Sequence, residues 1–252
     1  MKNMIKVLCV ALCLMMALPF AMAEEKPVLK VGTNAEFAPF EYVDDEGNFG
    51  GFDMKLMAAI CEKLGYEMEI VNMEFDSLIP ALESGKIDVS IAAITNRPDR
   101  AERVNFTENY FEAYQALIVK ADSEYTAVAA GMKVGVQQGT TGDFYASDIL
   151  GEDSTDVVRY AKALDAVIDL NNGRLDAVVV DVAPAQAYTA DYEGLTILDI
   201  EDADPDLYAI AVVKGNDELT EAINGALAAL IADGTYDALY ESEYVGYFGA
   251  DE

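Results

Sequence analysis

This chain of 252 residues contains no histidine and no tryptophan, and it has only three cysteines. Without histidine, Ser-His and Cys-His catalysis are excluded, and so are zinc sites that use an imidazole ligand. Cys9 and Cys13 lie in an N-terminal apolar run, so Cys61 is alone in the rest of the chain and no intramolecular disulfide is predicted. Residues 56–64 show helical apolar spacing around Cys61, which favours a buried small hydrophobic residue over a reactive thiol.

The N-terminal segment has the pattern of a secretory signal peptide. Lys2 and Lys6 flank the start of a short apolar run that ends with Ala21-Met22-Ala23 and is followed by two glutamates. This predicts a signal peptide over residues 1–23, cleaved after Ala23, and an exported protein. The alternative is a membrane anchor, but the run is short for a span and lacks a basic flank after it. No later segment predicts stable membrane insertion.

Positive charge is scarce as well. There are 16 basic against 46 acidic residues, so the formal net charge is -30. This argues against binding to nucleic acid or to anionic lipid, because both need clustered lysine and arginine. A hydrophobic content of 52% excludes disorder. The acids are scattered, which indicates a solvated and repulsive surface; an acidic interaction module without a ligand is the alternative.

Short apolar strands alternate with helical patterns, which predicts an α/β fold. The predicted strands cover residues 28–33, 66–71, 87–94, 115–119, 133–136, 157–160, 177–181, 196–198 and 208–213. The predicted helices cover residues 53–64, 75–84, 98–103, 142–150, 163–171, 184–192, 218–232 and 237–244. The pattern restarts near residue 115 without a Gly/Ser-rich linker, so two α/β units are expected. Ligands of open α/β sheets bind beyond the carboxyl ends of strands.

Four motifs follow one another in the chain. Residues 31–42 read VGTNAEFAPFEY, residues 51–61 GFDMKLMAAIC, and residues 75–88 FDSLIPALESGKID. Residues 93–107 read AITNRPDRAERVNFT and hold three of the five arginines. With these motifs the chain resembles the periplasmic solute-binding proteins for polar amino acids (family 3), the receptors of ABC importers, over residues 29–246. Lys55 stands where this family usually has an acid; it should lie on the exposed side of its helix.

The resemblance implies a two-lobed, Venus-flytrap fold with two mixed, mainly parallel sheets. The chain would cross between the lobes near residues 113–116 and 206–209. Lobe 1 is expected to comprise residues 24–114 and 208–252, and lobe 2 residues 115–207. The implied function is a monomeric periplasmic receptor that closes on a free amino acid and delivers it to an ABC permease. Neither catalysis, nor a cofactor, nor a metal is expected.

The resemblance also implies which residues hold the ligand carboxylate. Arg100 is assigned to it, since a planar guanidinium can bind both oxygens at once. Thr95 would donate beside it, and Thr141 would donate from the second lobe. The alternative for Arg100 is a surface ion pair with Asp99 or Glu102.

The ligand ammonium would meet Asp181 and the carbonyl of Ala93. Asp181 ends an apolar strand, where an acid projects from the sheet edge. Its alternative role is the N-cap of the helix that follows.

Phe37 and Phe75 match family aromatics that sandwich the ligand, although either could be an ordinary core residue. Asn34 and Gln137 stand where the family varies polar groups with the substrate. Because both are neutral, a neutral polar ligand side chain is favoured. The alternative for Gln137 and Thr141 is an ordinary strand-to-helix turn. Glu36 could face either the cleft or solvent, and a cleft-facing Glu36 would reopen the case for a basic ligand.

Arg97 and Arg103 are expected to make ordinary surface ion pairs.

Two other functions fit the same fold. One is a dehydratase, in which Glu36 or Asp181 would move a proton. The other is a receptor that passes its ligand to a sensor protein.

Overall fold

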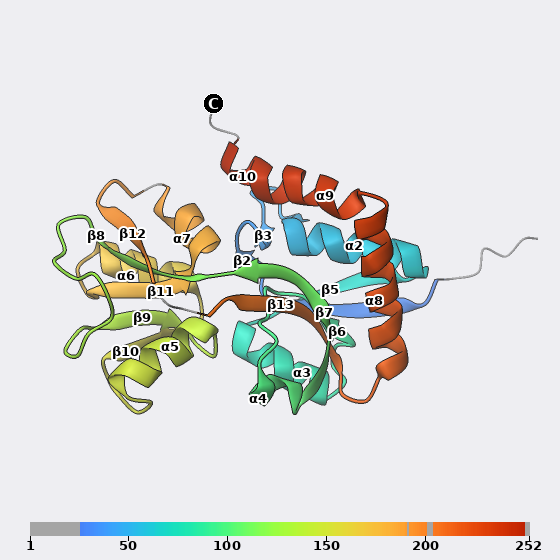
Figure 1. The fold of residues 1–252 in the computed structure, drawn as a ribbon, viewed down its shortest axis with the longest axis horizontal. Coiled ribbons are helices and arrows are strands. Elements are labelled where there is room, and N and C mark those ends of the chain that lie inside the picture. The colour runs from blue at the N-terminus through green and yellow to red at the C-terminus, as the bar shows by residue number, and fades with distance from the viewer. Residues whose placement is uncertain (1–25, 191, 201–203, 250–252) are drawn as a thin grey trace, which may run out of the picture.

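The computed structural model describes residues 26–190, 192–200 and 204–249, so the predicted signal peptide lies outside the described residues. Two α/β lobes stand side by side, with two strands running between them (Figure 1). This confirms the predicted fold class.

The sheet of the first lobe has five strands. Their order is β5 (Glu67–Asn72), β1 (Val28–Thr33), β6 (Val89–Ser90), β13 (Asp206–Val213) and β7 (Val104–Ala113). Alternate residues of β13 face opposite sides of the sheet, as the period of a strand requires. Ile210 and Val212 pack in the core beneath α2 (Phe52–Leu64) and α8 (Asp217–Ala232), and Ala211 packs in the core beneath α3 (Leu78–Glu83).

The second lobe repeats this plan. Its strand order is β10 (Val157–Tyr160), β9 (Val134–Gln137), β11 (Ala177–Asp181), β8 (Gln115–Lys120) and β12 (Leu195–Asp199). The helices are α5 (Thr141–Leu150), α6 (Ala163–Asn171) and α7 (Val182–Thr189). All five residues of β11 are buried, which explains why its sequence is a continuous apolar run that ends in an acid.

Both sheets are mixed. β1 pairs in parallel with β5 and β6, whereas β13 runs antiparallel to β6 and β7. In the second sheet, β9 pairs in parallel with β10 and β11, whereas β8 runs antiparallel to β11 and β12. Parallel pairs therefore make up half of each sheet, where the sequence predicts a majority. The antiparallel pairs involve the strands that enter and leave the second lobe.

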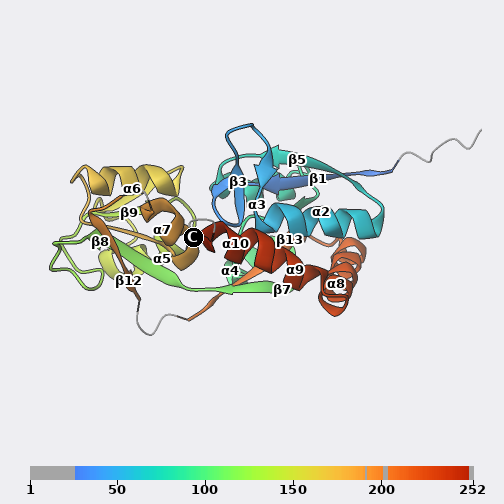
Figure 2. The same ribbon diagram turned by 90° about the horizontal axis from the view of Figure 1, so that it is seen from above.

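Smaller elements complete the chain. β2 (Glu36–Phe37), β3 (Glu41–Val43) and β4 (Phe49–Gly50) form a small antiparallel sheet, and α4 (Pro98–Ala101) is a single turn. A 3-10 turn at Phe75–Ser77 precedes α3. After α8 come α9 (Thr235–Leu239), a π-helical segment (Tyr240–Val245) and α10 (Gly246–Gly249). Seen from above, this C-terminal run leads from α8 toward the second lobe (Figure 2).

One predicted strand needs correction, and one long strand was missed. The strand expected over residues 87–94 is regular only at Val89–Ser90, because the chain leaves the sheet and Ala93 adopts a left-handed φ of 48°. The ten-residue strand β7 was not predicted. Its pairing with β13 contains two register shifts, so its buried residues do not alternate regularly and the period of a strand is lost.

Other expectations are confirmed. Lys55 is exposed. Cys61 is buried, and burial raises the pKa of its thiol to about 11, as befits a small hydrophobic residue. Within the described residues, no helix is both long and apolar enough to cross a membrane.

Candidate functional site

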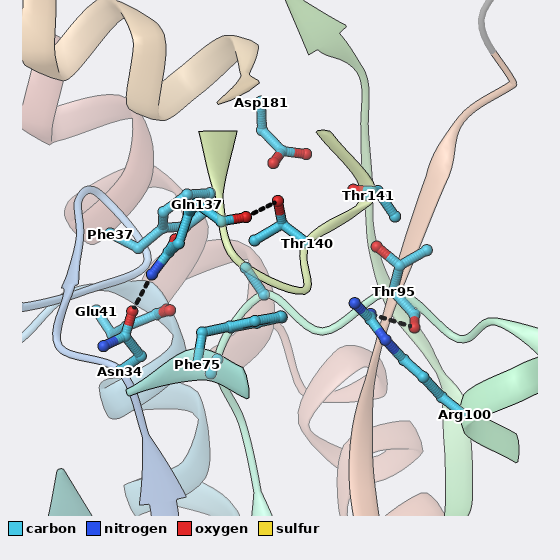
Figure 3. Close-up of a pocket in the computed structure, with 12 residues that line it drawn as sticks. Asn34, Phe37, Glu41, Phe75, Thr95, Arg100, Gln137, Thr140, Thr141 and Asp181 are labelled. Atoms are coloured by element: carbon cyan, nitrogen blue, oxygen red, sulfur yellow. Dashed lines mark hydrogen bonds between the residues drawn. The ribbon is translucent and has the colours of Figure 1, made fainter. Parts of the chain in front are cut away.

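The carboxyl ends of β1, β9 and β11 meet between the lobes and border a narrow pocket. All nine predicted ligand-binding residues line it (Figure 3). They are Asn34, Phe37, Phe75, Ala93, Thr95, Arg100, Gln137, Thr141 and Asp181. Glu41, Ala92 and Thr140 line it too and were not predicted. The structure thus brings the nine together, while their contact with a ligand stays a prediction.

Arg100 is buried at one end of the pocket. Its Nη1 donates to the carbonyl of Thr95 at 3.0 Å, and its Nη2 donates across the lobes to the carbonyl of Gly139 at 2.9 Å. Burial lowers the pKa of Arg100 to about 10, so the guanidinium is charged at neutral pH. A guanidinium has five N–H groups, so donors remain for an anion in the pocket.

The other two arginines of the motif behave as predicted. Arg97 pairs with Asp99 at 2.9 Å, and Arg103 pairs with Glu83. Asp99 is therefore engaged by Arg97, and Arg100 itself makes no salt bridge within the described part of the chain. The surface-pair interpretation of Arg100 is wrong, because its side chain turns inward between the lobes.

Asp181 stands at the N-cap position of α7, yet its side chain makes no capping hydrogen bond. Instead its Oδ1 accepts from Gln115 Nε2 at 3.0 Å, and the residue is 6% exposed. Burial, and then the charge of Asp206, raise the pKa of Asp181 to about 7. The side chain therefore belongs to the pocket, and the capping interpretation does not hold.

Gln137 and Asn34 join the lobes at the opposite end. Gln137 Nε2 donates to Asn34 Oδ1 at 2.8 Å and to the carbonyl of Ala161 at 3.0 Å. Asn34 Nδ2 donates to the carbonyl of Met73 at 3.0 Å. Both hydrogens of the Gln137 amide are thus engaged within the protein.

The N-cap of α5 is Thr140 and not one of the predicted site residues Gln137 and Thr141. Thr140 is the N-cap of α5 and accepts from the backbone N–H of Asp143 at 3.3 Å. Thr141 is free of that role, and its Oγ1 accepts from Gln115 Nε2 at 3.0 Å.

The two predicted aromatics belong both to the pocket and to the core. Phe37 is 7% exposed and stacks on Phe40 with ring centroids 6.3 Å apart. Phe75 packs at the edge of the core around α3, and its ring centroid lies 5.4 Å from Arg100 Cζ. Phe75 lies between Arg100 and Asn34, and Phe37 lies at the end of the pocket beside Gln137 (Figure 3).

Ala93 holds a conformation that costs a non-glycine residue about 1–2 kcal/mol, with φ at 48°. Its N–H donates to Asp53 Oδ2 at 2.8 Å, and the same oxygen accepts from Tyr110 at 2.7 Å. Burial raises the pKa of Asp53 to about 6. This buried carboxylate therefore fixes the strained turn beside the pocket.

Glu41 is the residue that sequence reasoning missed. It is fully buried in β3 and lines the pocket, yet within the described residues no N–H or hydroxyl group donates to either carboxylate oxygen. Burial, then the charge of Asp53 and a hydrogen bond to the Asp53 carboxylate, raise the pKa of Glu41 well above the ordinary range. Its position between two aromatic residues, Phe40 and Tyr42, was the one sequence feature that could have indicated burial. Its strand is too short to show the alternation of buried and exposed residues.

Glu36 does not line the pocket; it forms an ion pair with Lys162 of the second lobe at 2.5 Å. Other contacts also cross between the lobes around the pocket. Gln138 Nε2 donates to Asp76 Oδ2 at 2.8 Å, Tyr188 donates to the carbonyl of Glu36 at 2.7 Å, and Arg97 Cζ lies 3.9 Å from the ring centroid of Phe144. The lobes are therefore in contact on several sides of the pocket.

Residues 29–246 match the model of the bacterial extracellular solute-binding proteins, family 3. This chain belongs to that family. It is 36% identical to the ABC transporter arginine-binding protein 1 of Escherichia coli, over 87% of this chain and 90% of the relative.

Solved structures agree with this membership. An ancestral arginine-binding protein bound to arginine is 41% identical with a TM-score of 0.82, covering 87% of this chain and 99% of the other. An ancestral arginine-binding protein bound to glutamine is likewise 41% identical, with a TM-score of 0.80 over 87% and 98%. The receptor thus captures a free amino acid between two lobes for an ABC importer.

The raised pKa of Asp181 predicts how stability depends on pH. Its pKa is about 7 in the folded protein and about 3.9 when unfolded. Between these values the folded state holds the extra proton, so stability falls as pH rises from about 4 to about 7. The loss from this residue is at most on the order of 4 kcal/mol.

The measurement is urea unfolding of ligand-free protein, refolded from denaturant, between pH 5 and 8. The control is Asp181→Asn, which should flatten the dependence between pH 5 and 7. Parallel curves for the two proteins would contradict the assignment.

Proposed function

We propose that the ligand is an amino acid with a cationic side chain and that Glu41 is its counter-charge. One observation carries this proposal: a fully buried carboxyl group lines the pocket, and among the described residues no donor reaches either of its oxygens. An unpaired buried charge is costly, so such a group either keeps a proton or waits for a cation. Glu41 lies beside Asn34, at the end of the pocket away from Arg100 (Figure 3).

A cationic amino acid matches the charges of the pocket one for one. Arg100 and the backbone N–H of Thr95 would hold its carboxylate, with Thr141 donating from the second lobe; the Thr95 hydroxyl donates to Asp206. Asp181 and the Ala93 carbonyl would hold its ammonium. Phe37 and Phe75 would enclose its aliphatic stem. A neutral side chain would leave Glu41 without a charged partner.

The sequence favours a neutral polar side chain, because Asn34 and Gln137 are neutral. In the structure the Gln137 amide gives its hydrogens to Asn34 and Ala161, which leaves it no N–H for a ligand. The arginine-binding relatives support the cationic proposal. A glutamine-like ligand is the second candidate: a protonated Glu41 could donate to its side-chain carbonyl, and one similar structure holds glutamine.

Closure would follow from the division of the site. Arg100, Thr95 and Glu41 come from the first lobe, and Thr141 and Asp181 from the second. A ligand therefore makes all its contacts only when the lobes meet, and this differential binding shifts the population toward the closed form. The division into lobe 1 (residues 24–114 and 208–252) and lobe 2 (residues 115–207) stays a prediction.

Two further points remain proposals. The protein would be exported to the periplasm after cleavage behind Ala23, as expected for this family. It would have no catalytic activity. The dehydratase alternative assigns proton transfer to Glu36 or Asp181. Of these two, only Asp181 lines the pocket, because Glu36 pairs with Lys162 outside it.

Substituting Arg100→Ala should weaken amino-acid binding by about 3–5 kcal/mol, because the ligand carboxylate would be buried without its partner. Arg103→Ala is the matched control, since it removes an arginine of the same motif whose ion pair with Glu83 lies on the surface of the first lobe, and it should cost at most about 1 kcal/mol. Isothermal titration of both variants tests the site. Near-normal affinity in Arg100→Ala would sink the assignment.

Arginine and its neutral isostere citrulline test the ligand class. A thermal-shift screen of the twenty amino acids, ornithine and citrulline comes first. In isothermal titration, arginine should then bind about 30- to 100-fold more tightly than citrulline. Glu41→Gln should shrink this ratio to within about threefold, since the charge partner is gone. Glu36→Gln, an acid outside the pocket, should leave the ratio unchanged. If citrulline or glutamine binds wild-type protein as tightly as arginine, the cationic proposal is wrong.

Closure predicts a more compact protein in the presence of ligand. Small-angle scattering of ligand-free protein should give a larger radius of gyration than the complex with the tightest amino acid. Arg100→Ala at the same ligand concentration should resemble the ligand-free form. Equal radii for wild-type protein with and without ligand would contradict closure.

A further inference from the structure

Gln115 and Asp206 are buried polar residues on the two segments that cross between the lobes. Gln115 begins β8, and Asp206 begins β13 directly opposite Ala113 at the end of β7. They are 5% and 7% exposed. Neither residue lines the pocket, and neither was among the predicted site residues.

The side-chain nitrogen of Gln115 faces more acceptors than it can serve. Nε2 lies 2.7 Å from Asp206 Oδ2, 3.0 Å from Asp181 Oδ1 and 3.0 Å from Thr141 Oγ1. An amide nitrogen carries only two hydrogens, so three acceptors compete for them. A carboxylate is the stronger acceptor, which leaves the Thr141 hydroxyl at a disadvantage while both acids are ionised.

The same network reaches the first lobe. The other oxygen of Asp206, Oδ1, accepts from the hydroxyl of Thr95 at 3.2 Å. Through Gln115 and Asp206, the two threonines assigned to the ligand carboxylate are therefore connected to the acid assigned to the ammonium. This connection runs through the hinge and not through the ligand.

We propose that Gln115 is a positioning residue that couples the ammonium site to the carboxylate site at the hinge. The proposal rests on the assigned roles of Asp181 and Thr141. When the ligand ammonium binds Asp181, that carboxylate gains its own donors, and the second amide hydrogen of Gln115 passes to Thr141. Thr141 then accepts from Gln115, and its hydroxyl hydrogen is free to point at the ligand carboxylate.

The Gln115 amide also donates to two neighbouring carboxylates, those of Asp181 and Asp206. The groups that face Asp181 are Asp206, Tyr208, Gln115 and, further off, Arg100, Glu41 and Tyr188. The hydrogen bond from Gln115 lowers the pKa of Asp181, against burial and Asp206, which raise it. Without the amide, Asp181 would keep its proton to a higher pH and would meet an ammonium less often in the ionised form.

The test substitutes Gln115→Met, which keeps the length of the side chain and removes the donors. Titrations with L-arginine and with L-glutamine at pH 6, 7, 8 and 9 should show about 10- to 100-fold weaker binding near pH 7. The loss should shrink toward pH 9, where Asp181 is ionised in both proteins. A loss that is the same at every pH would indicate mere structural damage and would overturn the proposal.

Gln138→Met is the matched control. Gln138 also donates across the lobes, to Asp76, but it does not touch the network. Its variant should show a change of at most about threefold that does not vary with pH. An equal pH-dependent loss in Gln138→Met would overturn the role of Gln115.

A second variant keeps the proposal testable if Gln115→Met does not fold. Asp206→Asn removes the charge that competes with Asp181, so binding should persist to lower pH than in wild-type protein. A shift to higher pH, or none, would overturn the coupling. Both probes carry the same ammonium, so this result does not depend on whether Glu41 selects a cationic side chain; the arginine-to-citrulline ratio decides that separately.

Discussion

The pocket is governed by an imbalance of buried charge. Within the described part of the chain, Arg100 is the one buried basic side chain, and it lies in a region that also buries Glu41, Asp53, Asp181 and Asp206. Surface acids are solvated, but these are not, so each must find a donor, keep a proton or accept a ligand cation. The raised pKa values of Asp53 and Asp181 follow from this constraint.

Each buried acid meets the constraint in its own way. Asp53 accepts from Ala93 and Tyr110 and so stabilises a strained turn. Asp206 accepts from Gln115 and Thr95 and joins the two crossing strands. Asp181 shares one amide with Asp206, and no donor in the described chain reaches Glu41. Asp53 and Asp206 hold the scaffold through the donors they accept from, and Asp181 and Glu41 face the pocket.

The sequence predicted most of the scaffold. The apolar runs of β1, β10 and β11 and the helical pattern of α6 were predicted within their observed bounds, because regular burial leaves a regular period. β7 escaped because its register shifts break that period. The small sheet of β2, β3 and β4 escaped because its strands are too short to show one.

The sequence by itself determined the family, the two-lobed fold and nine of the twelve residues that line the pocket. Six of the nine lie in the four motifs, and Gln137, Thr141 and Asp181 follow from the resemblance at the strand ends of the second lobe. Only the tertiary structure decided which acids face that pocket. Glu36 and Glu41 stand in one motif, yet the first pairs with Lys162 outside the pocket and the second is buried within it. Gln115 and Asp206 lie 91 residues apart and meet only because both crossings pass the same point. Burial and pairing depend on such distant neighbours, which no local pattern records.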